Sequence, residues 1–161
     1  MKILRRLPVP FARALVRVGA RGIALYNRAF HPRVRGVGVF VRWGDCMLLV
    51  RSTYQSWWGI PGGRVDRGEE PRAAAARELR EETALEAAPE ALALLGELQL
   101  EHNHIRDHVS FFELRCDREP SVRADGAEIA ELRWVRENEL AAFKLWPPLA
   151  AWSARAAMPQ D

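Results

Sequence analysis

The stretch that decides the fold is residues 62–85, which read GGRVDRGEEPRAAAARELREETAL. Its first half is rich in glycine, and Pro71 precedes a run of four alanines after one arginine. Proline suits the first turn of a helix, and alanine has the highest helix propensity. The sequence therefore predicts a tight loop that leads directly into a helix over residues 69–83.

Three glutamates of this helix, Glu78, Glu81 and Glu82, are spaced i, i+3, i+4 and therefore share one face. Their charges repel one another unless a cation lies among them. Carboxylate oxygens are ligands that Mg²⁺ and Mn²⁺ prefer, and Mg²⁺ takes further ligands from substrate phosphates. The face therefore indicates metal-dependent phosphate chemistry. The alternative is a solvated acidic face partnered by Arg77 and Arg80.

The glycine-rich loop has features that suit a place beside an ion. Gly62 and Gly63 allow the backbone to turn sharply and to expose its carbonyl groups. Glu69 and Arg77 are eight residues apart, and both lie on or beside the predicted helix. A pair between this carboxylate and this guanidinium would hold the loop against the helix and keep the glutamates rigid.

Apolar runs on both sides of this stretch predict strands. The expected strands are residues 34–42, 45–51, 92–101, 106–116 and 129–135. The other expected helices are residues 11–29, 137–143 and 148–157. Gly44-Asp45 suits the turn of a hairpin between the first two strands. This order of elements predicts an α/β fold, in which a mixed sheet has helices on its faces.

Residues 63–85 resemble the Nudix box at every fixed position but one. The matching positions are Gly63, Glu69, Arg77, Glu78, Leu79, Glu81, Glu82 and Leu85. Ala84 stands where the family usually has the glycine that closes the helix, so we expect the difference at the helix end rather than in the chemistry. The flanking residues 34–63 and 129–140 resemble the family as well.

This resemblance implies a Nudix-type α/β/α sandwich with a mixed sheet over residues 31–161, preceded by a basic amphipathic helical extension over residues 1–30. It implies a pyrophosphohydrolase that cleaves the diphosphate linkage of a nucleoside diphosphate joined to another group. Water attacks phosphorus in this reaction, and divalent metal neutralises the developing charge. The implied cofactor is Mg²⁺ or Mn²⁺, and the implied partner is a nucleotide-type small molecule.

The resemblance also assigns roles to residues of this chain. The residues that match the metal ligands are Glu78, Glu81, Glu82 and the carbonyl group of Gly62. The residues that match the structural support of the box are Gly63, Glu69 and Arg77. One of the three glutamates, or a glutamate from a later loop, orients or deprotonates the attacking water. Glu128 is the candidate for that later catalytic acid, because it lies six residues before Trp134, as in mutator-type members.

Candidate substrate-binding residues precede the box. Trp57 and Trp58 offer rings on which a nucleobase can stack, the alternative being core packing for Trp58 and a loop position for Trp57. Arg51 could grip a phosphate, the alternative being a surface ion pair. Residues 98–102 match none of the substrate signatures of the dinucleoside polyphosphate or ADP-ribose members, so the sequence does not name the substrate.

Four polar residues crowd the turn between the strands at 92–101 and 106–116. They are His102, His104, Asp107 and His108. Their spacing matches no zinc finger, and no cysteine is near in sequence. The alternatives to a zinc site here are a plain polar hairpin and a loop that contacts substrate.

Charge divides the chain unevenly. Residues 1–44 hold ten basic residues and no acid, whereas the remainder holds the other 14 basic residues and all 21 acidic ones. Within residues 11–29, four arginines share an arc of roughly 80° and large apolar side chains occupy the other side. This amphipathic face could pack on the body of the protein, in a homodimer interface or on an anionic membrane surface.

Composition narrows the class of protein. The chain has 161 residues, which is the length of a single domain, and 48% of them are hydrophobic. Its two cysteines exclude a disulfide scaffold and predict buried thiols in a reducing compartment. With no membrane-span or secretory-signal pattern found, the sequence predicts a cytoplasmic enzyme. Two alternatives remain: an RNA 5′-end pyrophosphohydrolase, prompted by the arginine-rich arm, and a Nudix-like module that senses a nucleotide without turnover.

Overall fold

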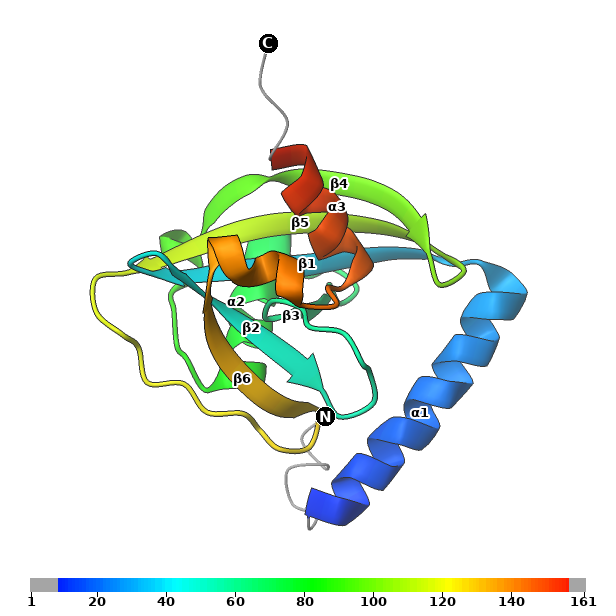
Figure 1. Ribbon diagram of the computed structural model, residues 1–161. Coiled ribbons are helices and arrows are strands. Elements are labelled where there is room, and N and C mark those ends of the chain that lie inside the picture. Colours follow the sequence, from blue (N-terminus) through cyan, green and yellow to red (C-terminus); the bar gives the residue numbers. More distant parts are fainter. Residues whose placement is uncertain (1–8, 157–161) are drawn as a thin grey trace.

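The strand β1, Arg33–Trp43, runs through the middle of a six-stranded mixed sheet in the computed structural model, which describes residues 9–156 (Figure 1). Along one edge β1 pairs in parallel with β5, Ile105–Cys116. Along the other edge it pairs antiparallel with β3, Gly62–Arg64, and then at its end with β2, Cys46–Ser52. This shared edge brings the glycine-rich loop into the centre of the sheet.

Two outer strands complete the order β4-β5-β1-β2-β6. The strand β4, Ala93–His102, pairs antiparallel with β5, and β6, Ile129–Arg136, pairs antiparallel with β2. Alternate residues of β1 point to opposite faces of the sheet, because side chains alternate along a strand. Val39 lies in the core on one face and Phe40 in the core on the other, as expected for a sheet covered on both sides.

The helix α2, Pro71–Thr83, covers the first face with Ala74, Ala75 and Leu79, all fully buried. It begins two residues later than the sequence predicted, because Glu70 has an extended backbone at φ −75° and ψ 137°. A residue before proline disfavours the helical region, so Glu70 remains outside the helix.

The opposite face is covered by α3, Pro147–Ala156, and by the short 3₁₀ helix η3, Glu137–Ala142. Trp152 of α3 packs on Phe111 with ring centroids 4.6 Å apart. A Cβ atom on Gly96 would lie 3.1 Å from the Trp152 ring, so the bulge of β4 at this glycine makes room for the indole. The predicted α/β/α sandwich is therefore confirmed. Residues 137–143, predicted as a helix, form a 3₁₀ helix instead.

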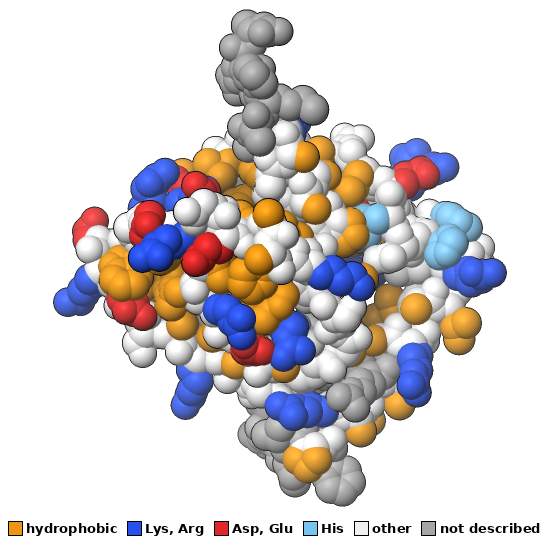
Figure 2. All heavy atoms as spheres, viewed as in Figure 1, with side chains coloured by type: hydrophobic (Ala, Val, Ile, Leu, Met, Phe, Trp, Pro, Cys, Tyr) orange, Lys and Arg blue, Asp and Glu red, His pale blue; other side chains and the backbone are white. Residues whose placement is uncertain are grey.

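The N-terminal helix α1, Val9–Phe30, runs alone beside the body (Figure 1). A hydrogen bond of 2.8 Å from Arg13 Nε to the carbonyl oxygen of Gly126 joins it to the body, and the side chain of Asn27 is buried. The apolar side chains described on it are exposed, so packing on the protein's own body does not account for its amphipathic face. Apolar and arginine side chains gather on the visible surface where this helix lies (Figure 2).

Some predictions concern parts that lie outside the described residues. These parts are the basic residues Lys2, Arg5 and Arg6, the side chains of Phe11 and Arg17, and both ends of the predicted division into 1–30 and 31–161. In the described part of the chain, no helix is long and apolar enough to cross a membrane. The cysteines are free thiols, as predicted, but both are half-buried rather than buried.

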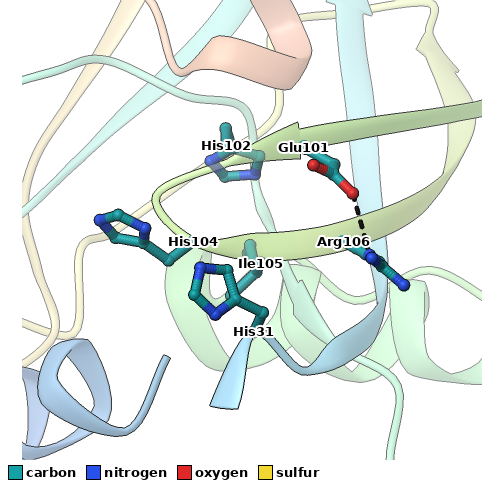
Figure 3. Close-up of a pocket in the computed structure, with 6 residues that line it drawn as sticks. All are labelled: His31, Glu101, His102, His104, Ile105 and Arg106. Atoms are coloured by element: carbon teal, nitrogen blue, oxygen red, sulfur yellow. Dashed lines mark hydrogen bonds and ion pairs between the residues drawn. The ribbon is translucent and has the colours of Figure 1, made fainter. Parts of the chain in front are cut away.

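The turn between β4 and β5 is a tight hairpin in which Asn103 and His104 have positive φ angles of 46° and 62°. Two residues with positive φ match the right-handed twist of the strands they join. Beside the turn is a hollow of about 270 Å³, lined by His31, Glu101, His102, His104, Ile105 and Arg106 (Figure 3). Each histidine with a short polar contact here has a carboxylate partner: His102 with Asp107 at 2.9 Å and His108 with Glu97 at 2.8 Å. These pairs agree with the polar-hairpin alternative.

Candidate active site

The glycine-rich loop and the glutamate face of α2 meet at very close range. A Cβ atom on Gly62 would overlap the carbonyl oxygen of Val37, and one on Gly63 would lie 2.6 Å from the Glu78 carboxylate. Only glycine therefore lets β3 lie between β1 and α2. The close approach also allows the Gly62 amide to donate a hydrogen bond of 2.9 Å to Glu82 Oε2.

Burial changes the acidity of this face. Glu78 and Glu82 are each 8% exposed, although they are charged residues on a helix. Loss of water raises the pKa of Glu82 well above its usual value, and the nearby charges of Glu78 and Glu128 raise it further, against the opposing effect of the Gly62 amide. Burial likewise raises the pKa of Glu78, which Arg77 opposes. The two carboxylates are held in place at an electrostatic cost.

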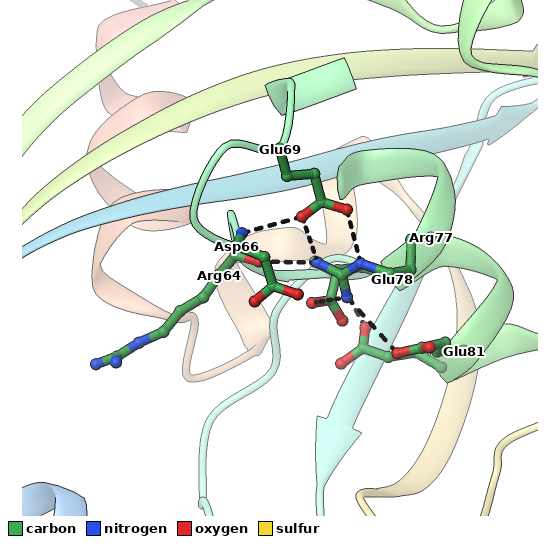
Figure 4. Close-up of polar contacts among 8 residues, drawn as sticks. Arg64, Asp66, Glu69, Arg77, Glu78 and Glu81 are labelled. Carbon is green, nitrogen blue, oxygen red and sulfur yellow. Dashed lines mark hydrogen bonds and ion pairs between the residues drawn. The ribbon is translucent and has the colours of Figure 1, made fainter. Parts of the chain in front are cut away.

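Arg77 connects the loop to this acidic face (Figure 4). Its Nε and Nη2 atoms donate to the two oxygens of Glu69, both at 2.9 Å. Its Nη1 atom donates to Glu78 Oε1 at 2.7 Å and lies 3.6 Å from Glu81 Oε2. Its Nη2 atom also donates to the carbonyl oxygen of Arg64 at 3.0 Å. The guanidinium group therefore contacts the loop backbone, the loop carboxylate and the glutamate face at once.

Glu69 in turn holds the loop by accepting a hydrogen bond of 3.0 Å from the Asp66 amide. The hydrogen bonds and charge of Arg77 lower the pKa of Glu69, and the Glu69 carboxylate raises the pKa of Arg77. Two-pronged contacts of this kind fix both partners in orientation as well as in distance. The structure thus places Glu69 and Arg77 in the contact that their spacing suggested.

A loop far along the chain brings a fourth carboxylate to the same place. Asp125 Oδ1 accepts hydrogen bonds from three successive amides, those of Ala127, Glu128 and Ile129, at 2.8–3.1 Å. The carbonyl oxygen of Glu128 accepts a hydrogen bond of 2.8 Å from the Thr53 amide. Burial raises the pKa of Glu128, and the charges of Asp125 and Glu81 raise it further. Glu128 is therefore within electrostatic reach of the helical glutamates.

Sequence reasoning assigned no role to two residues of this cluster. The Asp125 side chain shapes the loop, and the Tyr54 side chain hydrogen-bonds with Glu128. Burial, with the charges of Glu128 and Glu82, raises the pKa of Tyr54 to about 12, so its hydroxyl group keeps its proton at neutral pH. An Asx-type turn motif could have indicated Asp125, whereas nothing in the local spacing indicates Tyr54.

The residues predicted to bind substrate all have other side chains of the protein nearby. Arg51 Nη2 contacts Glu131 Oε2 at 2.6 Å, as in the ion-pair alternative. Trp58 is half-buried, and the central guanidinium carbons of Arg51 and Arg133 lie 5.5 and 5.0 Å from its ring. Trp57 is less constrained, with Lys144 Nζ 6.0 Å from its ring. The alternative of core packing thus describes Trp58 better than Trp57.

The acidic cluster offers the ligands that a divalent cation prefers. Glu78, Glu81 and Glu82 supply hard oxygens, and the absence of a side chain at Gly63 leaves the loop backbone close to them. A cation would also relieve the repulsion that raises the pKa values of Glu78 and Glu82. The residues present therefore fit a divalent metal. This fit rests on the chemistry of the oxygen donors, because no three His, Cys, Asp or Glu side chains of the described residues are grouped closely enough to hold an ion.

Comparison with known proteins agrees with this geometry. The family model described as "NUDIX domain" matches residues 32–156. A protein of Bacillus subtilis (strain 168), named "Putative 8-oxo-dGTP diphosphatase", is 37% identical over 97 residues, which are 60% of this chain and 62% of that protein. The matched part thus spans about three fifths of the relative's length.

Solved structures share the fold. The MutT protein of Methanosarcina mazei Go1 superposes with a TM-score of 0.66 at 22% identity, covering 78% of this chain and 94% of that one. The ORF135 protein of E. coli superposes with a TM-score of 0.61 at 26% identity, covering 83% and 98%. Their similarity extends over most of the sandwich that carries the acidic cluster.

Proposed function

The chain belongs to the Nudix family, and on that premise we propose that it is a metal-dependent pyrophosphohydrolase that cleaves the diphosphate linkage of nucleotide-type substrates. The observation that carries this proposal is the buried set of Glu78 and Glu82 against a loop that only glycine allows, with Glu128 brought to the same place. Burying acidic residues at this cost suits a site that binds a cation.

The acidic residues have two roles in the proposal, which are metal binding and proton transfer. Glu78, Glu81 and Glu82 hold the metal, with the Gly62 carbonyl group as a further ligand. When bound, Mg²⁺ or Mn²⁺ would neutralise the charge that develops on the phosphate oxygens. Glu128 accepts the proton of the attacking water, because a carboxylate whose pKa is raised is a better base near neutral pH. Gly63, Glu69 and Arg77 keep the loop and the glutamates in fixed positions relative to one another.

The substrate part of the proposal starts from nucleoside triphosphates. The relative from Bacillus subtilis carries the name of an 8-oxo-dGTP diphosphatase, which supports testing oxidised purine deoxynucleotides first. Trp57 is the candidate platform for the base, because the ring of Trp58 already packs against Phe143 and lies near two guanidinium groups. Arg51 Nη2 is paired with Glu131, so Arg51 would contact phosphate through its other guanidinium donors or by exchanging this pair.

The test is a screen of the full chain with Mg²⁺ or Mn²⁺ in which the reaction products are separated and identified. The substrates are normal and oxidised nucleoside triphosphates, nucleotide sugars, ADP-ribose, dinucleoside polyphosphates and 5′-triphosphate RNA. We expect a nucleoside triphosphate to yield a nucleoside monophosphate and pyrophosphate. Preferred cleavage of the RNA would favour the alternative of an RNA 5′-end pyrophosphohydrolase. Nucleotide binding without turnover of any substrate would favour the sensing module.

Glu128→Gln tests the proposed base against a matched control. The change keeps the size of the side chain and removes its ability to accept a proton, so we expect turnover to fall about 100-fold or more. The control is Glu90→Gln, the same change at an exposed position of the turn η2, Pro89–Ala91. Equal turnover in both variants would remove Glu128 from the mechanism and leave the metal-binding glutamates untouched.

Two further proposals concern the setting of the enzyme. We propose that the domain extends over residues 31–161 and that residues 1–30 are an addition to it, supported by the end of α1 at Phe30 and the start of the family match at residue 32. We also propose a cytoplasmic location, which the two free thiols support. Fractionation of cells that express the full chain would test the location.

A further inference from the structure

The helix α1 has an apolar face that the described part of the body leaves uncovered. Its six exposed large side chains are Leu15, Val18, Ile23, Leu25, Tyr26 and Phe30. Their exposed fractions run from 51% at Ile23 to 71% at Leu25. An apolar strip of this length is unusual on the surface of a soluble domain and marks a site of contact.

The position of these side chains around the helix is specific. At 100° per residue they fill an arc of about 160°, with Leu15 near its middle. The buried Asn27 and Arg13, which contacts the body, lie about 120° and 160° from Leu15 on the helix. The apolar arc therefore points away from the sheet, and turning it inward would break the contact between Arg13 and Gly126.

Charge borders this arc on one side. Arg21 and Arg28 are exposed and lie next to Leu25 around the helix. No acidic residue occurs anywhere in residues 1–44, so no carboxylate of this segment neutralises the two guanidinium groups. The helix thus presents an apolar surface edged with uncompensated positive charge.

We propose that α1 is a peripheral membrane anchor that lies in the plane of an anionic lipid surface. Its apolar arc enters the boundary between headgroups and acyl chains, and Arg21 and Arg28 contact lipid phosphates. Helices that combine a wide apolar face with a cationic border bind anionic lipid surfaces through burial of apolar area and through electrostatic attraction. This inference goes beyond the proposed hydrolysis and does not depend on it.

A second copy of the chain is a less suitable partner for the apolar face of α1. Two α1 helices packed face to face would bring their arginines together without an acidic residue between them. Outside α1, the exposed large apolar side chains among the described residues are Tyr54, Leu94 and Leu95, which offer little matching area. Anionic lipid supplies both the apolar environment and the negative charge, so charge complementarity favours the membrane.

The membrane-bound orientation keeps the acidic cluster accessible. The lipid would lie on the side of α1 opposite to the sheet, because the arc points away from Asn27. The contact between Arg13 and Gly126 connects α1 to the loop that contains Glu128. The anchor therefore places the proposed active site beside a membrane without covering it with the anchor's apolar face.

The experiment is co-sedimentation of the full chain with vesicles of phosphatidylcholine alone and of phosphatidylcholine mixed with phosphatidylglycerol. We expect binding to the mixed vesicles that weakens as salt increases. The double variant Val18→Glu with Leu25→Glu removes apolar area and adds repulsion, so we expect its partition coefficient to fall about tenfold or more. The matched control is Leu94→Glu with Leu95→Glu, the same kind of change at exposed apolar side chains of β4, and it should bind as the unaltered chain does.

A second pair of variants tests the cationic border. Arg21→Gln with Arg28→Gln should weaken binding to mixed vesicles about 25-fold, because each residue at the surface contributes about 1 kcal/mol, a factor of about five. Arg67→Gln with Arg118→Gln, which changes two exposed arginines of the body, is the control for net charge. Circular dichroism and thermal melting verify that every variant keeps its fold, which we expect because all the altered side chains are exposed.

Several results would overturn the proposal. They are absence of binding to the mixed vesicles, equal binding to phosphatidylcholine alone, or equal loss of binding in the Leu94 and Leu95 control. Light scattering adds a test of the competing occupant. A dimer that forms with rising concentration and is lost in the Val18 and Leu25 variant would assign the face to a second copy instead.

Discussion

The helices α2 and α1 show that hydrophobic content does not decide which helix of this protein is buried. The shorter α2 lies against the sheet, where Ala74, Ala75 and Leu79 are fully buried. On the longer α1, six of the large apolar side chains that the structure describes are at least half exposed. Small side chains allow α2 to approach the strands closely, whereas the arc of α1 points away from them.

The same difference explains where chemistry is placed. Because α2 lies close to the sheet, its glutamates lose water and stand against the loop at Gly63, which raises the pKa values of Glu78 and Glu82. The charges of α1 remain in water and are suited to contact with another surface. The fold thus changes the pKa values of glutamates on α2, whereas the exposed charged side chains of α1 stay in contact with water.

The largest expected difference between the two helices is in turnover. We expect Glu82→Gln to reduce kcat about 100-fold or more, because it removes a charge that stabilises the transition state through the metal. Arg21→Gln in α1 should leave kcat unchanged. Steady-state kinetics with the substrate found in the screen measures both, and near-normal turnover of the Glu82 variant would exclude this residue as a metal ligand.

The metal-free Glu82 variant should also melt at a higher temperature than the unaltered chain at neutral pH. Burial raises the pKa of Glu82 in the folded state above its unfolded value, so its charge destabilises the fold at pH values above both. This penalty shrinks as the pH falls below the folded-state pKa and is gone below the unfolded-state pKa. The difference in Tm should therefore shrink toward acid pH in a thermal scan with chelator, and a constant difference would contradict this cause.

The next comparison is between the effects on the free energy of unfolding of shortening one leucine in each helix. Leu79→Ala should cost about 2–5 kcal/mol in the free energy of unfolding, because the fully buried side chain leaves a cavity. Leu25→Ala removes the same atoms from a side chain that is 71% exposed, so we expect a change within about 0.5 kcal/mol. Denaturant unfolding without lipid measures both. A loss at Leu25 as large as that at Leu79 would show that α1 is packed in solution.

A smaller effect is expected from Arg77→Ala, which removes the contacts with Glu69, Glu78 and the loop backbone but no proposed metal ligand. Support of this kind is worth about 10- to 100-fold in metal affinity or activity. Raised Mg²⁺ should recover part of the activity, and titration calorimetry should show weaker Mn²⁺ binding. Arg80→Ala on the exposed side of α2 is the control. A complete loss that excess metal does not relieve would indicate that Arg77 contacts substrate.

The smallest expected effect concerns the end of α2. Ala84 has a left-handed backbone with φ 58° and ψ 11°, and its amide donates to the carbonyl oxygen of Arg80. A residue with a Cβ is strained there and glycine is not, so Ala84→Gly should stabilise the fold by about 1 kcal/mol. Denaturant unfolding measures the gain. A decrease in stability would mean that the Ala84 methyl group has a favourable contact that outweighs the strain.

The sequence by itself determined the local features of the site. Glu78, Glu81 and Glu82 share a face because a helix repeats every 3.6 residues, and this holds wherever the helix packs. The contact between Glu69 and Arg77 spans eight residues of one loop and one helix, so spacing was enough to suggest it. The order of strands and helices likewise predicted the sandwich, because apolar alternation marks strands before any of them pair.

Tertiary structure decided everything that joins distant residues. The hairpin turn could be predicted, but the parallel pairing of β1 with β5 brings together strands more than 60 residues apart, and no local pattern encodes it. Glu128 comes near Glu82 because Asp125 shapes its loop, and Arg51 meets Glu131 because β2 pairs with β6. The sequence showed that α1 is amphipathic. Only the packed structure showed that its apolar side points outward, because that direction depends on which side chains of α1 are buried, as Asn27 is, or contact the body, as Arg13 does.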